Sequence, residues 1–430
     1  MHEQPSQTMP VSALRVGVFV HLDLGWLDHP FPFGSFKIAT EQQIEIIRGL
    51  GLSTVRWDPA KSDASIELPP PEATAAAPVS PIGGLNGAVD VEALERQRLA
   101  ESLRAQRQAL QHCERRYSEG ARAFRHIAED AASKPEAACE RAVQTVDGMV
   151  SELLDAPEAA IRLLTEGQGE RASVHAMNVT VLSLLLGRAM ELPADSLRDL
   201  GVAALLHDLG KSEVPERVRY RDESFTAAHH KMYQVHVAHS VAIGKRMGLS
   251  PMALLTVSQH HELADGSGFP TGCKADRMAP SSRILALINR YDGLCNPPNP
   301  LKALTPHEAL SLLFATQKER FESTTLGAFI RMMGVYPPGS LVQLTDGRFA
   351  MFVAVNSSRP LKPTVLAHDR GANRDDALLL DLQHDRATGV LRSLRADQLP
   401  RASLEYLAPR QRICYYFERA RGTAPAEGSA

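Results

Sequence analysis

Two stretches of sequence decide the fold: HDLGK at residues 207–211 and HHELADGSGFP at residues 260–270. Each follows an apolar segment of helical character, LGVAALL before the first and LLTVSQ before the second. His175 lies on another predicted helix about thirty residues before the first stretch, and His236 lies about thirty residues after it. Imidazole and carboxylate groups on the inward faces of helices suit Fe, Mn, Zn or Ni. The pattern therefore predicts a helical bundle built around a metal site.

The metal interpretation depends on the combination of residues. A single histidine on an apolar helix is more often a core or surface residue than a ligand, and no role is assigned to His229, His230 or His239. The combination places histidine on four predicted helices, joins one of them to Asp208, and adds Lys211 at a fixed offset. Chance is a poor explanation for that arrangement.

Both stretches resemble the HDxGK and HHExxDGxGYP signatures of the HD-GYP phosphodiesterases, the subgroup of the HD superfamily that hydrolyses the bacterial messenger cyclic di-GMP. The resemblance runs from about Ala172 to Leu310, and Phe269 replaces the tyrosine of the second signature. Residues 11–58 are similar to a small uncharacterised domain that often precedes an HD-GYP domain, and the segment from Thr305 onward is similar to the tail of the subgroup. The resemblance implies a mainly α fold: an HD-type helical bundle with small β-containing N-terminal and C-terminal domains.

Carried over residue by residue, the resemblance implies a set of metal ligands with Asp208 as the bridging carboxylate: His175, His207, Asp208, His236, His260 and His261. The last ligand of the family is an aspartate, and this sequence has Asn289 there. An amide oxygen can coordinate but carries no charge, so one metal should be held more weakly; Asp292, one helical turn later, is an alternative ligand. Arg171 stands where some members have an acidic ligand for a third metal, so the expected cofactors are two divalent ions, Fe or Mn.

The same resemblance implies roles for residues beside the ligands. Asp208 and Lys211 are the expected catalytic residues, because Lys211 can reach a phosphate oxygen or the leaving alkoxide; an ordinary surface lysine is the alternative. Two metals bind the phosphate oxygens and lower the pKa of a bridging water. A rigid loop that lets substrate approach the backbone would be formed by Gly266, Gly268, Phe269 and Pro270. A plain turn is the other interpretation of that loop.

The sequence is compatible with three alternative functions. The first is a phosphodiesterase that hydrolyses cyclic di-GMP to the linear dinucleotide or GMP in bacterial signalling. The second is a degenerate domain that binds nucleotide or a partner protein without turnover, because of Asn289. The third, an HD phosphohydrolase acting on a nucleoside polyphosphate, is disfavoured because general HD enzymes lack the GSGFP segment.

Composition limits the partners. The chain has 430 residues, 44% hydrophobic and 23% charged, with a net charge of −3, so it has no basic excess for duplex nucleic acid. Its five cysteines lack CxxC spacing, which argues against a disulfide scaffold or a zinc finger. No apolar run reaches the ~18 residues of a membrane span, and the first residues lack the layout of a signal peptide. We expect a cytoplasmic protein whose substrate is a cyclic dinucleotide. A homodimer through a helix over 91–132 and a signalling partner protein are both possible partners.

The chain is expected to divide into six segments. A small β/α domain over 9–58 includes a short helix over 42–50, and a Pro/Ala-rich linker over 59–90 follows. A long exposed helix over 91–137 comes next, with a helix that packs on its own chain as the alternative. The HD-GYP domain over 138–333 follows and is expected to be helical nearly throughout. A β-rich extension over 334–415, with a hairpin around the Asp346-Gly347 turn, precedes a flexible tail over 416–430.

Overall fold

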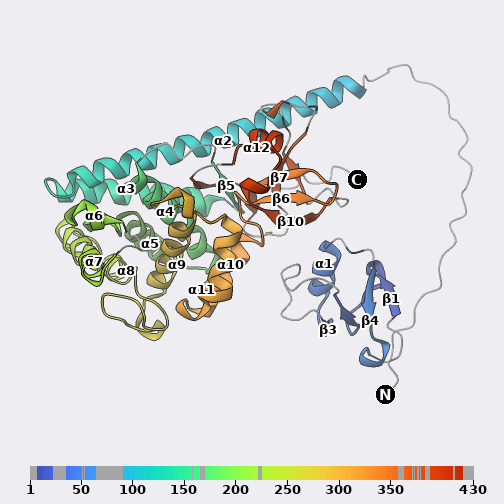
Figure 1. Cartoon of the computed structure of the whole chain (residues 1–430), viewed down its shortest axis with the longest axis horizontal. Coiled ribbons are helices and arrows are strands. Elements are labelled where there is room, and N and C mark those ends of the chain that lie inside the picture. Colours follow the sequence, from blue (N-terminus) through green and yellow to red (C-terminus); the bar gives the residue numbers. More distant parts are fainter. Residues whose placement is uncertain are drawn as a thin grey trace, which may run out of the picture. The chain divides into compact units, whose positions relative to one another are not determined.

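The computed structural model describes residues 7–22, 35–50, 52, 54–63, 91–156, 158–164, 170–220, 225–356, 363–369, 371, 373–374, 377, 379–382, 388–409 and 412–419. Most of the expected linker over 59–90 lies outside the described residues. The chain divides into two compact units, Met1–Glu101 and Ser102–Ala430 (Figure 1).

The first unit is built on a small antiparallel sheet. Its strands β1 (Gln7–Pro10), β2 (Phe19–His21), β3 (Ser35–Lys37) and β4 (Thr54–Trp57) lie in the order β1-β4-β2-β3. Helix α1 (Glu41–Gly49) begins at Thr40, whose side chain and that of Gln43 form a capping box. The buried residues of the sheet and helix form one core that includes Val18, Val20, Ile44, Ile47 and Trp57. This is the small β-containing domain that the sequence predicts.

The long helix expected from the sequence is α2 (Val91–Asp130). It was expected to be exposed, with packing on its own chain as the alternative, and for its second half the alternative is correct. Residues at helical spacing on one face are buried in the second unit, and α3 (Pro135–Asp155) follows after a short turn. These buried residues are Gln106, Cys113, Tyr117, Ala121, Phe124 and Ile127. Charged residues lie between these positions in the sequence, so the buried face of the helix is not apparent from the sequence.

The second unit contains the bundle of helices that carries the predicted site. Its helices are α4 (Arg171–Ala189), α5 (Ala194–Leu206), α6 (Glu216–Arg219), α7 (Ala227–Met247), α8 (Pro251–Ser258), α9 (Pro280–Cys295), α10 (Pro306–Thr316) and α11 (Ser323–Met333). Helix α4 is central: it contacts α5, α9, α11 and the C-terminal sheet and is buried over most of its length. A helix that is apolar all round is expected at such a position. Within the described part of the chain, no helix is both long and apolar enough to cross a membrane.

A seven-stranded antiparallel sheet belongs to the same unit. The strands β5 (Ala159–Leu163), β6 (Leu341–Leu344), β7 (Phe349–Asn356), β10 (Val390–Leu394) and β11 (Tyr415–Arg419) lie in the order β10-β6-β7-β5-β11. Strand β8 (Thr364–Ala367) pairs with β7 and with β9 (Leu380–Asp381), and α12 (Arg401–Leu407) follows β10. The expected hairpin is confirmed, with Leu341 opposite Met351 and Gly347 at φ +87° in the turn. Helices and sheets together confirm the predicted fold class.

Two strands correct the expected segments. Strand β5 lies in the stretch expected to be helical, and β11 lies mostly in the expected flexible tail. They pair with each other from Tyr415–Leu163 to Arg419–Ala159, and every residue of β5 is buried. A short apolar run such as AAIRL suits a buried strand as well as a helix, and only its distant partner decides between them.

The division into units predicts that residues 1–90 can be removed. The buried face of α2 begins at Gln106, and the predicted metal ligands all lie beyond residue 170. We expect the shortened chain to melt cooperatively and to bind the same amount of Mn²⁺ as the full chain, measured by circular dichroism and elemental analysis. An aggregated or metal-free product would contradict a separable N-terminal unit.

Candidate metal centre

The predicted ligands come from the ends and inner faces of neighbouring helices. His175 lies on α4, and His236 lies on α7. His207 ends α5, and Asp208 begins the short 3-10 turn Leu209–Glu213. The pair His260 and His261 follows the end of α8. Because α8 packs against both α5 and α7, the 3-10 turn packs against α7 and α4 packs on α5, these side chains meet in one place.

The six side chains form two groups that share Asp208. One group is His175, His207 and Asp208, and the other is Asp208, His236, His260 and His261; the ligand atoms of each group lie within 4.8 Å of one another. Asp208 Oδ2 lies 3.4 Å from Nε2 of both His175 and His207. Its Oδ1 lies 3.5 Å from His236 Nε2 and 3.7 Å from His260 Nε2. The carboxylate thus stands between the two groups.

The hydrogen bonds of the imidazoles show which nitrogen faces the centre. Nδ1 of His207 donates to the carbonyl of Ala204, 2.8 Å away, and Nδ1 of His260 donates to the carbonyl of Val257 at 2.6 Å. Nδ1 of His236 likewise donates to the carbonyl of Tyr233, three residues earlier, at 2.5 Å. A carbonyl oxygen only accepts, so in these three rings Nδ1 carries the proton and the lone pair of Nε2 points inward.

This arrangement fits a cation. The Nε2 atoms of His236 and His260 lie 3.2 Å apart, although neither ring has a proton there to share. Among the described residues, the buried Oδ1 of Asp208 has no hydrogen-bond partner. Facing lone pairs and an orphaned carboxylate oxygen repel one another unless a positive charge lies among them. The donor set of imidazole and carboxylate suits a divalent transition metal.

Burial keeps most of the histidines neutral. It lowers the pKa of His236 to about 4 and holds the pKa values of His260 and His261 well below the ordinary range. Burial opposes ionisation of Asp208, but the neighbouring His207 and Lys211 outweigh it and hold the pKa of this carboxyl well below its usual value. Neutral imidazoles beside an ionised carboxylate are the protonation states that metal binding requires.

His175 differs from the other histidines because it lies between two carboxylates. Its Nδ1 is 2.6 Å from Asp292 Oδ2, and its Nε2 faces Asp208. Burial alone would lower the pKa of His175, but the hydrogen bonds to Asp208 and Asp292 raise it to about 9. His175 must therefore release the Nε2 proton before it can bind a metal, and the Nδ1 bond to Asp292 fixes its ring for that role.

Asp292 belongs to a network that joins α4, α9 and the C-terminal segment. Its Oδ1 accepts from the side-chain amides of Asn178 and Asn296, each at 2.8 Å. Both amides also donate to the carbonyl of Ile413, and Asn178 Oδ1 accepts from the backbone N–H of Tyr415. Both oxygens of Asp292 are thus occupied, which makes it a positioning residue for His175. The sequence offered Asp292 only as an alternative ligand and overlooked Asn178, although a polar residue three positions after His175 on an apolar helix was the available signal.

Asn289 and Arg171 lie near this network with different surroundings. Asn289 lies one turn before Asp292 on α9 and is half-buried, and among the described residues its amide has no hydrogen-bond partner. Arg171 begins α4, donates to the carbonyl of Pro298 at 2.8 Å and lies over the ring of Tyr220. Because Arg171 is positively charged, it cannot serve as the acidic ligand that a third metal would need.

Lys211 is bound to the central carboxylate. Its Nζ lies 2.5 Å from Asp208 Oδ2 and between the rings of Tyr220 and Tyr233, at 5.8 and 5.7 Å from their centroids. Burial disfavours the ammonium, but Asp208 outweighs it and raises the pKa of Lys211. Gly210 lets this turn lie against α7, because a Cβ there would be 2.2 Å from the carbonyl oxygen of His236. The HDLGK spacing therefore delivers a charged lysine to the centre.

The GSGFP loop lies directly on His261. The Phe269 ring stacks on that imidazole with centroids 4.5 Å apart, and the Phe269 N–H donates to the His261 carbonyl at 3.1 Å. A Cβ on Gly268 would lie 2.4–2.6 Å from backbone atoms of residues 261–263, so only glycine fits there. Gly266 adopts φ +83°, whereas Pro270 is exposed at the rim.

Glu262 holds this loop in place through hydrogen bonds. The side chain is fully buried and accepts from the backbone N–H and the hydroxyl of Thr271, both at 2.7 Å, and from the N–H of Cys273 at 3.1 Å. The sequence motif contains Glu262 but does not by itself predict a role for it. A buried carboxylate needs such donors, and a charged residue directly after the histidine pair was the signal for it.

Comparisons with known proteins identify two domains in the chain. Residues 131–325 match the family described as HD domain, and residues 6–156 match a domain of unknown function, DUF3391. The chain is 28% identical over 365 residues to the cyclic di-GMP phosphodiesterase PA4108 of Pseudomonas aeruginosa, covering 83% of this chain and 84% of that protein. It is 24% identical over 192 residues to the cyclic di-GMP phosphodiesterase PdeB of Borreliella burgdorferi, covering 45% and 51%.

A solved structure is also similar to the chain. It is the HDG"Y"P protein Bd1817 from Bdellovibrio bacteriovorus, with a TM-score of 0.41 and 14% identity over 75% of this chain and 97% of that one. By the two family matches, the chain is an HD-domain protein. More particularly, it carries a DUF3391 domain ahead of the HD domain, and the relatives named above are phosphodiesterases by name.

The network around His175 predicts that Asp292→Asn weakens metal binding. An amide has one oxygen, so it cannot accept from His175 and from the two asparagines together. We expect Mn²⁺ affinity to fall about 10–100-fold, the usual effect of losing a group that orients a ligand. Isothermal titration with Mn²⁺ measures this, with the exposed Asp276→Asn as the matched control. Equal affinity in both variants would show that Asp292 does not position His175.

Proposed function

We propose that this protein is an HD-GYP-type, metal-dependent phosphodiesterase that hydrolyses cyclic di-GMP to the linear dinucleotide or GMP in bacterial second-messenger signalling. The observation that supports it most is the convergence of five histidines on the shared carboxylate of Asp208. Two relatives, which match 83% and 45% of this chain, are named cyclic di-GMP phosphodiesterases. The second signature, HHELADGSGFP, favours this substrate over a nucleoside polyphosphate.

The two groups of side chains suit two divalent ions, with Fe or Mn as the proposed metals. His175 and His207 would hold one ion, and His236, His260 and His261 would hold the other, with Asp208 shared and Asn289 as a weak neutral ligand. When bound, such ions draw charge from the phosphate oxygens and lower the pKa of a bound water. Arg171 and the absence of an acidic group at its position favour two ions over three.

Lys211 is proposed to act on the phosphate. Its ammonium group stays charged beside Asp208 and carries three protons, one of which is donated to Asp208 Oδ2. The two protons not given to Asp208 are available to a non-bridging phosphate oxygen or to the departing alkoxide. Because Tyr220 and Tyr233 flank the ammonium, its position is restricted before substrate arrives.

The GSGFP loop is proposed as the substrate-facing wall. Glu262 holds it in place, and Gly268 lets it pack directly on the backbone of residues 261–263, so we propose that Gly266 and Gly268 belong to a rigid loop that the substrate approaches. The ring of Phe269 covers one face of His261 beside the centre, and an aromatic ring there suits contact with a nucleobase. Pro270 forms the exposed end of the wall. We propose that the protein acts in the cytoplasm; a homodimer through α2 and a signalling partner stay predictions.

The hydrolysis assay tests the proposal. Protein purified without oxygen and supplied with Mn²⁺ or Fe²⁺ should convert cyclic di-GMP to products seen by chromatography, and His207→Ala and Asp208→Ala should each abolish hydrolysis and remove most of the metal. Asp208 touches both groups, so its loss should affect both ions. The exposed His126→Ala on α2 is the matched control. Wild-type metal content in Asp208→Ala would end the assignment.

Asn289 separates the enzyme from a binding module. A neutral ligand leaves the centre one negative charge short, so we expect a slow enzyme whose rate rises with added metal. Asn289→Asp should raise metal occupancy and rate together, with affinity increasing about 10–100-fold. Elemental analysis and steady-state kinetics measure the two effects. If neither protein hydrolyses cyclic di-GMP with any metal, a degenerate domain that binds nucleotide or a partner replaces the enzyme.

A further inference from the structure

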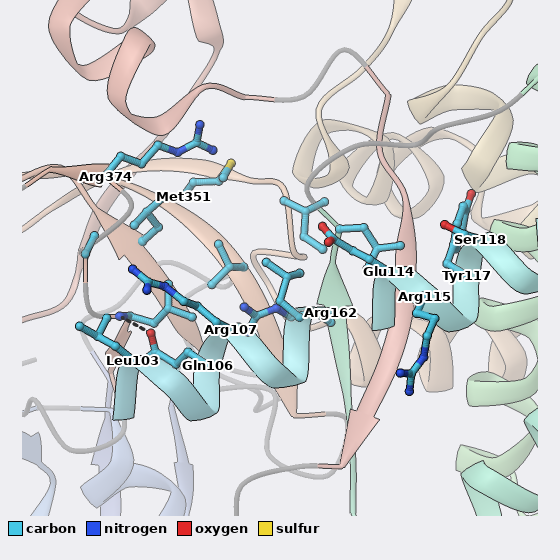
Figure 2. A pocket seen from close by; sticks show the side chains of 17 residues that line it. Leu103, Gln106, Arg107, Glu114, Arg115, Tyr117, Ser118, Arg162, Met351 and Arg374 are labelled. Atoms are coloured by element: carbon cyan, nitrogen blue, oxygen red, sulfur yellow. Dashed lines mark hydrogen bonds between the residues drawn. The ribbon is translucent and has the colours of Figure 1, made fainter. Parts of the chain in front are cut away.

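A cavity lies between α2 and the C-terminal sheet, away from the metal centre. Its volume is about 950 Å³, at the upper end of the size typical of small-molecule sites. Its walls come from α2, β5, β7, β8 and the residues Arg374, Ala377 and Leu379, all within the second unit (Figure 2). None of the lining residues found in the described chain is a proposed metal ligand or part of the GSGFP loop.

The lining combines an apolar surface with an excess of positive charge. Side chains from both walls make the surface apolar: Leu103, Leu110, Met351, Val353, Leu366 and Leu379. The charged residues are four arginines, at positions 107, 115, 162 and 374, against the single Glu114. Figure 2 shows Arg107, Arg162 and Arg374 around the cavity, whereas the Arg115 side chain turns away, where it bonds to His112.

Arg162 provides the second observation that points to a ligand. This residue is 5% exposed, and its Nη1 lies 3.4 Å from Glu418 Oε1. Among the described residues, its Nε is buried without a hydrogen-bond partner, as is Oε2 of Glu418, and Arg162 also lines the cavity. An unsatisfied guanidinium N–H inside a protein is costly, and an anionic oxygen is the acceptor that best removes the cost.

We propose that this cavity binds a small organic anion, with its charged head among Arg107, Arg162 and Arg374 and its apolar body against Met351, Val353 and Leu366. The size of the cavity excludes a single inorganic ion as a snug occupant, because most of the lining would stay uncovered. The apolar surface excludes a ligand that is polar throughout. This site is independent of the proposed hydrolysis.

Two dyes of similar shape test the proposal on the full chain. Anilinonaphthalene sulfonate is anionic, and N-phenylnaphthylamine is uncharged; both become fluorescent in an apolar site. We expect the anionic dye to bind more tightly and to be displaced by decanoate but not by decanol. Arg107→Gln and Arg374→Gln should each weaken the anionic dye about tenfold and leave the uncharged dye unchanged. Arg115→Gln is the matched control and should match wild type.

A cavity-filling variant distinguishes this site from other surfaces that bind dyes. Leu110 is half-buried on α2 and lines the cavity, so Leu110→Trp should occupy the space and reduce the binding of both dyes. Arg107 is exposed, so its replacement leaves the core intact, and melting curves confirm the fold of each variant. Unchanged affinity for the anionic dye in Arg107→Gln, Arg374→Gln and Leu110→Trp would overturn the proposal.

Discussion

The buried carboxylate of Asp208 is the constraint on which the rest of the second unit depends. An ionised carboxylate inside a protein is stable only when positive or hydrogen-bonding groups surround it. Here those groups are Lys211 and the protonated Nε2 of His175, whereas the inward lone pairs of the histidines from α5, α7 and the end of α8 are compatible with the carboxylate only around a bound cation. The helices must therefore converge at one point. Gly210 allows the closest of these approaches, where the turn after Asp208 lies against α7.

The outer nitrogens of the histidines connect the centre to the surrounding structure. Three rings are held by carbonyls of their own helices, so their orientation follows from local structure alone. His175 is held instead by Asp292, which is itself held by Asn178 and Asn296 and, through them, by the backbone at Ile413. The sheet and the bundle therefore act as one structural unit around the centre.

The sequence predicted the parts of the site that short motifs encode. The mainly α fold was predicted correctly, and the structure brings the six expected ligands together because apolar helices present them on inward faces. The role of Asp292 was missed, since a carboxylate one turn from an expected ligand can coordinate or orient with equal plausibility in sequence. Strands β5 and β11 were missed because each becomes a strand only through a partner far along the chain. The buried face of α2 was missed because Cys113 and Tyr117 are separated by charged residues.

The long-range support of His175 has a consequence for the order of events during synthesis. Asn178 and Ile413, which bond to each other beside Asp292, are 235 positions apart in the chain. At the usual pace of a ribosome, roughly 5–20 residues per second, that separation takes on the order of ten to fifty seconds. Throughout that interval the nascent chain carries its first histidines without the strand that completes their surroundings. The metal centre is therefore among the last parts of this unit to mature, although its first ligand emerges early.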